Sequence, residues 1–119
     1  ADIYLDSFPY SGMTSLLDPM AVGLPIVAIE GDFQRQRMSA SALHSLGLSN
    51  WLVASEQDYI EKSIAIANDL KLCQEMKVDL EKSMKAGPKF LNSLWYSKEI
   101  EKFFVQAFIA FQVILLKYL

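Results

Sequence analysis

The stretch that decides the fold is LDSFPYSGMTSLLDPMAVGLPIVAIEG, residues 5–31. A short β-rich run, residues 3–5, leads into a loop-forming segment over residues 6–12, where Ser, Pro, Asp and Gly gather. The pattern then predicts a helix over residues 13–22 and a compact apolar strand over residues 25–29. A strand, a helix and a second strand in this order indicate a parallel sheet.

The rest of the chain continues this alternation. We expect a helix over residues 33–46, a short strand over 51–53, helices over about 56–68 and 70–86, and a long apolar helix after Asn92. The predicted caps are Asp32, Ser55 and Asn92, and the predicted stops are Gly23, Gly47 and Gly87 followed by Pro88. The expected fold class is α/β, a Rossmann-like parallel sheet with flanking helices.

Composition limits the classes of function. The 119 residues fit one compact core, and a net charge of −3 without a dense run of Lys or Arg argues against nucleic-acid binding. Cys73 and His44 are the single cysteine and histidine, so we expect no disulfide and no metal site. The most apolar run, residues 107–116, is shorter than the roughly 20 residues of a membrane span. The single cysteine suits a reducing compartment, so we expect a cytoplasmic protein, and we see no signal-peptide pattern.

The loop after the first strand is the candidate ligand site. In open α/β sheets, ligands bind beyond the carboxyl ends of the strands, where residues 6–12 are expected to lie. Gly12 would let the backbone approach a ligand, and residues 13–15 would offer free backbone N–H groups to an anion. Asp18, one helical turn further on, would lie near the ribose of a nucleotide. On spacing alone, ordinary helix capping is the commoner explanation of these residues.

The same segment resembles the C-terminal catalytic half of the O-GlcNAc transferase and Spindly family. The resemblance is carried by LDSFPYSGMTS (residues 5–15), Asp18 and GLPIVA (residues 23–28). It continues through Arg37, Ala40, Leu43, Leu46-Gly47-Leu48, residues 56–59 and the region around Phe90, to about Phe104. The resemblance implies a GT-B fold, two Rossmann-like halves, of which this chain would be most of the half that holds the nucleotide sugar.

The resemblance also implies roles for individual residues. Gly12, Met13, Thr14 and Ser15 would meet the UDP diphosphate, and Asp18 would bind the ribose. The chain departs from the family at Met13, where a histidine is usual, and at Pro19, which lacks a backbone donor. The family's catalytic groups lie upstream, so no catalytic residue is assigned here. We expect no metal and no cofactor besides the UDP-sugar donor.

The function implied is the UDP-sugar-binding portion of a glycosyltransferase that moves N-acetylglucosamine or a related hexose onto protein side chains. We expect the isolated chain to be inactive, because transfer requires closure against the missing N-terminal half. Other possibilities stay open: a GT-B epimerase, a lipid-directed transferase, or a non-catalytic assembly module in which Met13 and Pro19 mark a dead site.

Further side chains are weaker candidates. Arg37, with Arg35, follows the second strand and would reach a phosphate, although a solvated helix start is equally common. Tyr10 and Asp6 would touch the sugar or the acceptor, and loop hydrogen bonds explain both as well. His44 is expected to be a partly buried helix residue.

The pattern divides the chain into residues 1–88, a partial nucleotide-sugar-binding domain, and residues 89–119, a C-terminal helix. The end of that helix, residues 103–118, is apolar on more than one face, which one helix cannot bury on a small sheet. We therefore expect it to cross to another half-domain or to a partner chain, or to self-associate.

Overall fold

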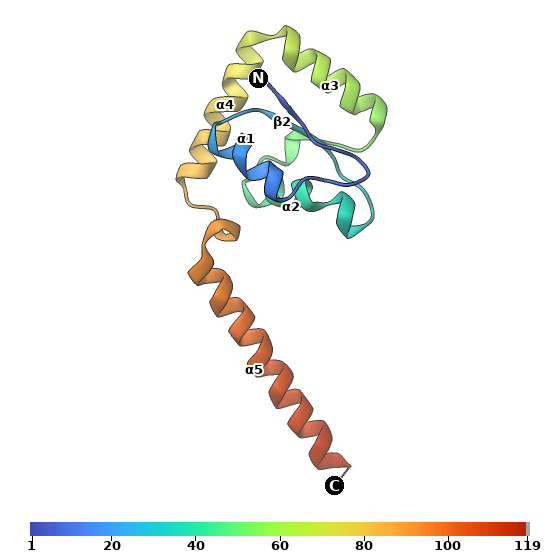
Figure 1. Cartoon of the computed structure of the whole chain (residues 1–119), viewed down its shortest axis with the longest axis vertical. Coiled ribbons are helices and arrows are strands. Elements are labelled where there is room, and N and C mark those ends of the chain that lie inside the picture. Colours follow the sequence, from blue (N-terminus) through green and yellow to red (C-terminus); the bar gives the residue numbers. More distant parts are fainter. Residues whose placement is uncertain (119) are drawn as a thin grey trace. The chain divides into compact units, whose positions relative to one another are not determined.

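The computed structural model describes residues 1–118. Three short parallel strands form a sheet in the order β1-β2-β3, and helices flank it (Figure 1), which confirms the expected α/β class. The strands are β1 (Tyr4–Leu5), β2 (Ile26–Ile29) and β3 (Leu52–Val53); the helices beside them are α1 (Leu17–Ala21), α2 (Met38–Ser45), α3 (Glu56–Asn68) and α4 (Leu70–Lys85). The 3₁₀ turns are η1 (Thr14–Leu16), η2 (Gln34–Gln36), η3 (Ser49–Trp51) and η4 (Lys89–Leu91).

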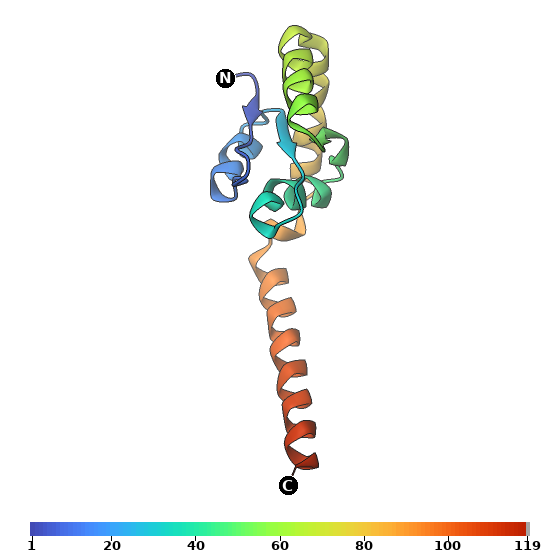
Figure 2. The ribbon, with the colours of Figure 1, turned by 90° about the vertical axis from the view of Figure 1, so that its right-hand side faces the viewer.

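Strand β2 lies in the middle of the sheet and supplies the centre of the core. All four of its residues are buried. A strand covered on both faces needs apolar side chains in succession, which explains the continuous Ile-Val-Ala-Ile run. Helices α2 and α3 contact β2, and α3 lies beside α4 (Figure 2). Leu43, Ile66 and Leu80, one from each of these helices, are almost fully buried.

Helix boundaries follow local signals. Ser55 Oγ accepts the backbone N–H of Asp58 at 3.1 Å, and Asn92 Oδ1 accepts that of Trp95 at 2.9 Å, which confirms both predicted caps. Asp69, which was not predicted as a cap, begins α4 by accepting two backbone N–H groups. The predicted glycine stops are confirmed by their positive φ angles: Gly23 at 73°, Gly47 at 74° and Gly87 at 73°.

The first two predicted helices, over residues 13–22 and 33–46, are shorter than expected. In place of one helix over residues 13–22, the turn η1 precedes the five-residue α1. Pro19 lies in the first turn of α1 and has no N–H to donate to Ser15, so the preceding turn closes as a 3₁₀ turn. The predicted Asp32 cap is wrong: η2 begins with the Phe33 N–H bound to Gln36 Oε1 at 3.1 Å, and α2 starts only at Met38.

The chain forms two compact units, Ala1–Pro88 and Lys89–Leu119. The second unit holds η4 and α5 (Ser93–Lys117), a helix of 25 residues. The prediction of a long apolar helix is not supported for α5 as a whole, because its first half carries Lys98, Glu99, Glu101 and Lys102. Within residues 1–118, no helix combines the length and apolar character that crossing a membrane requires.

Candidate functional site

The loop between β1 and η1 is held by the carboxylate of Asp6, which is only 5% exposed. Asp6 Oδ1 accepts the backbone N–H of Gly12 at 2.8 Å, and Oδ2 accepts the Ser11 hydroxyl at 2.8 Å. These two hydrogen bonds, one to each oxygen, stabilise the buried carboxylate. Asp6 therefore shapes the loop from inside, as the hydrogen-bonding interpretation of this residue predicts.

Side chains from later elements hold the same loop from outside. The backbone N–H of Ser39 donates to Ser11 Oγ at 2.8 Å, and the Ser39 hydroxyl donates to the Gly12 carbonyl at 3.0 Å. The Tyr59 hydroxyl on α3 donates to the Asp6 carbonyl at 2.8 Å. Burial, with the nearby Asp6 charge, raises the pKa of Tyr59, so the phenol stays protonated and keeps donating. Sequence reasoning missed Ser39 and Tyr59.

Gly12 is packed tightly against the protein itself. A Cβ at this position would lie 2.7 Å from Ser15 Oγ and from the Tyr4 hydroxyl, and 3.0 Å from Asp6 Oδ1. Its N–H already donates to Asp6. Gly12 thus permits the close packing of the loop, and the donors left for a ligand come from the residues that follow it.

The three residues after Gly12 present backbone donors at the protein surface. Met13, Thr14 and Ser15 are all exposed. In the described part of the chain, no group accepts a hydrogen bond from their backbone N–H groups. These are the orphan donors expected at the start of a helical turn. They lie where the sequence predicts an anion site.

Asp18 lies in the first turn of α1 and is exposed. Its carboxylate makes no hydrogen bond or ion pair with residues 1–118. Because η1 is a 3₁₀ turn, residues three apart eclipse one another, so Ser15 rather than Thr14 shares a side of the helix with Asp18. The Asp18 carboxylate is thus available to a ligand beside the exposed N–H groups.

A second polar cluster follows β2 and centres on Glu30. Its carboxylate contacts Arg37 Nη2 at 2.9 Å and His44 Nε2 at 3.0 Å, and His44 Nδ1 lies 2.8 Å from Ser49 Oγ. The hydrogen bond with His44, then that with Arg37, lowers the pKa of Glu30. His44 is exposed rather than partly buried as predicted, because its ring reaches out to these partners. Arg37 is already neutralised by Glu30.

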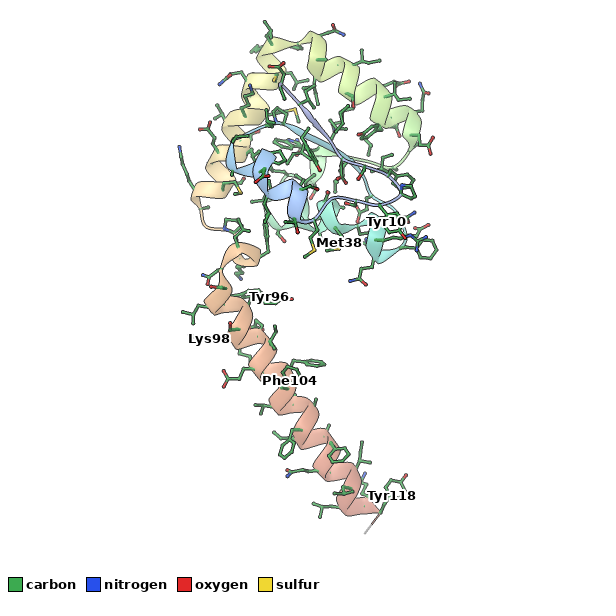
Figure 3. All side chains as sticks on the ribbon, viewed as in Figure 1. Tyr10, Met38, Tyr96, Lys98, Phe104 and Tyr118 are labelled. Carbon is green, nitrogen blue, oxygen red and sulfur yellow. The ribbon has the colours of Figure 1, made fainter. Side chains whose placement is uncertain are left out.

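Arg35 stands apart from that cluster. Its guanidinium carbon lies 4.9 Å from the Phe33 ring centroid and 5.7 Å from the Tyr10 ring centroid. Tyr10, labelled in Figure 3, is 69% exposed, and Phe33 is 58% exposed. The Ser11 N–H donates to the Arg35 carbonyl at 2.9 Å and ties η2 to the loop after β1. We call Tyr10, Phe33 and Arg35 the Arg35 platform.

Cys73 is buried and its thiol lies 3.6 Å from the Asp2 carbonyl. Among the residues that the structure describes, no group of three or more His, Cys, Asp or Glu side chains could hold a metal ion.

Comparison with known proteins identifies the relatives of this chain. The family model for glycosyl transferase family 41 matches residues 1–100. A probable UDP-N-acetylglucosamine–peptide N-acetylglucosaminyltransferase SPINDLY from Solanum lycopersicum is 31% identical over 87 residues, which are 73% of this chain and 9% of the relative. The protein of the same name from Eustoma exaltatum subsp. russellianum is 29% identical over 98 residues, 78% of this chain and 11% of the relative.

A solved structure shows the same fold. The Thermobaculum terrenum O-GlcNAc transferase, determined as a mutant, matches with a TM-score of 0.76 and 24% identity over 86% of this chain and 20% of that one. The chain spans about a tenth of the length of the curated relatives it matches. The resemblance noted over residues 5–28 is confirmed, and the chain belongs to glycosyltransferase family 41, whose matched relatives are named as enzymes.

Proposed function

We propose that this chain is the UDP-sugar-binding portion of the C-terminal half of a GT-B protein glycosyltransferase. The observation that carries the proposal is the set of exposed, unpartnered backbone N–H groups at Met13, Thr14 and Ser15, with the unpaired Asp18 carboxylate in the next turn. The family membership gives this arrangement its most direct explanation.

The chemistry of the site suits a nucleoside diphosphate. Backbone N–H groups at a helix start bind phosphate oxygens without a positively charged side chain. Replacement of the usual histidine by Met13 leaves the backbone donor in place. A carboxylate such as Asp18 accepts hydrogen bonds from ribose hydroxyls. Hydrogen bonds from the backbone N–H groups would hold the diphosphate without a bound metal, so we expect binding of UDP to be unchanged by chelators.

The names of the relatives support a proposal for the donor sugar and the acceptor. They are named as transferases that move N-acetylglucosamine from UDP to peptides, and we infer the same sugar or a related hexose, and protein side chains, for the parent enzyme of this chain. The chain contributes the donor-binding part and is inactive alone, because transfer requires a second half-domain to close over the substrate. We place this enzyme in the cytoplasm.

Calorimetry with UDP tests the proposal. The wild-type chain should bind UDP with equal affinity with and without EDTA, and Asp18→Ala should weaken binding about tenfold, the loss of one or two hydrogen bonds to a charged group. The matched control is Asp32→Ala, which removes another exposed carboxylate. If Asp18→Ala binds UDP as wild type does, the assignment of Asp18 to the ribose is wrong. If wild type does not bind UDP, the donor-site assignment is wrong and the results favour a non-catalytic module.

A further inference from the structure

The Arg35 platform presents a guanidinium whose donors are unused. Within residues 1–118, no carboxylate pairs with Arg35, and its guanidinium makes no hydrogen bond. Asp32, three residues before Arg35, forms no ion pair with it. Glu30, the next acid along the chain, is bound to Arg37 and His44. A guanidinium offers five N–H donors in a flat fork, so this one is open to a planar oxyanion from outside the chain.

The platform is also held in position. The rings of Phe33 and Tyr10 flank the guanidinium, and contacts of this kind restrict the side chain without consuming its N–H donors. The backbone beneath is fixed by the bond from Ser11 to the Arg35 carbonyl at 2.9 Å. Ser11 is itself held by Asp6 and by Ser39. The fork therefore has a defined place next to the loop that leads into Met13.

The surroundings favour a carboxylate on a polypeptide over a phosphate. Two exposed aromatic rings frame the guanidinium, and Tyr, Phe and Arg are the residue types enriched where proteins bind other polypeptides. A carboxylate fits the guanidinium fork in a bidentate pair, while neighbouring apolar groups of a peptide would cover the rings.

We propose that the Arg35 platform binds an acidic side chain of a polypeptide, and that this polypeptide is the acceptor of transfer. The acceptor role rests on the proposed function, whereas the binding of an acidic peptide by the platform does not. The platform thus sets a preference for Asp or Glu close to the modified residue.

Fluorescence anisotropy on the whole chain tests this inference. The probes are a short labelled peptide with aspartate on both sides of a serine, and the matched peptide with asparagine in both places. Wild type should bind the aspartate peptide about tenfold more tightly, the strength expected of one charge-assisted bidentate pair. Arg35→Gln should remove that preference, and Arg35→Lys should lose most of it, because an ammonium cannot form the fork. The control Lys82→Gln removes an exposed positive charge on α4 and should change nothing.

Two further measurements separate the alternatives. Phe33→Leu with Tyr10→Leu keeps the guanidinium but removes both rings, and should weaken the aspartate peptide by a smaller factor than Arg35→Gln. Equal affinity of wild type for the two peptides, or equal loss in Lys82→Gln, overturns the proposal. A loss of UDP affinity in Arg35→Gln with unchanged peptide binding assigns the arginine to the donor and also overturns it. If wild type prefers the aspartate peptide but does not bind UDP, the proposal for the Arg35 platform holds and the donor-site assignment is wrong.

Discussion

The Asp6 carboxylate accepts the backbone N–H of Gly12 at 2.8 Å and so closes the loop that joins β1 to η1. The closure sets where the chain turns before Met13, and therefore where the orphan N–H groups point. Asp6 therefore has a structural role in this loop. The ligand site depends on Asp6 through the position of the loop.

Asp6→Ala should destabilise the first unit. Gly12 N–H and Ser11 Oγ would both lose their acceptor in a part-buried place, and hydrogen bonds to a charged group contribute about 1.5–3 kcal/mol. We expect a loss of about 2–3 kcal/mol in the free energy of unfolding, measured by urea denaturation. Asp32→Ala, at an exposed position, should leave it within about 0.5 kcal/mol. Equal stability of the two variants would show that the loop is not held by Asp6.

Gly12→Ala tests the close packing of the same loop. The new Cβ would approach Ser15 Oγ and the Tyr4 hydroxyl to 2.7 Å, and such overpacking costs about 1–3 kcal/mol. Adding Ser15→Ala removes one of the two clashing atoms and should restore part of the loss, which a double-mutant cycle of thermal unfolding would measure.

Gly87→Ala is the matched control for the glycine change. This position has φ of 73° and no atom within 4 Å of an added Cβ, so only backbone strain of about 1 kcal/mol is expected. A Gly12→Ala variant that unfolds at the wild-type temperature would mean that Ser15 and Tyr4 move aside freely.

The elements set by local sequence could be predicted, and those set by distant contacts could not. The run at β2 and the stops at Gly23 and Gly47 depend on the chain's own periodicity and backbone freedom, and both are confirmed. The loop network depends on Ser39 and Tyr59, which lie 28 and 53 residues from their partners. No spacing rule links positions so far apart before the sheet brings them together.

The starts of helices near the site were harder to predict for a different reason. Asp32 has the chemistry of a cap, but η2 begins one residue later, with Phe33 at the N-cap position and its N–H bound to Gln36 Oε1. Pro19 was recognised as a missing donor, but the 3₁₀ turn that precedes α1 was not predicted from it. His44 was misplaced because its partner Glu30 lies on another element.

Glu30 should make stability depend on pH. Its folded pKa is lowered below 4.5, chiefly by the hydrogen bond with His44, so the unfolded chain binds the proton more readily. The stabilisation is complete above about pH 4.5 and is lost as the pH falls through the lowered folded value. Because the ion pairs are partly exposed and screened by solvent, Glu30→Gln should cost only about 0.5–1 kcal/mol at neutral pH. Denaturation at a series of pH values should show that the free energy of unfolding falls less steeply with decreasing pH in Glu30→Gln than in wild type.

The control for this profile is Glu101→Gln, an exposed carboxylate on α5. In this variant, the free energy of unfolding should fall with decreasing pH as steeply as in wild type. A Glu30→Gln profile that parallels wild type throughout the acid range would show that the contacts with Arg37 and His44 add nothing to folding. High salt should reduce the difference between wild type and Glu30→Gln, because exposed pairs are screened.

Helix α5 should cause the chain to self-associate. Phe104, Phe108 and Phe111 recur at helical spacing on one side of α5 and are 60–66% exposed. A continuous apolar surface of this kind is removed from water when two copies pair. Sedimentation velocity of wild type should show a species larger than the monomer. Replacing all three phenylalanines by Gln should leave a monomer, whereas Leu70→Gln, at an 86% exposed position on α4, should not. A monomeric wild type at high concentration would contradict this prediction.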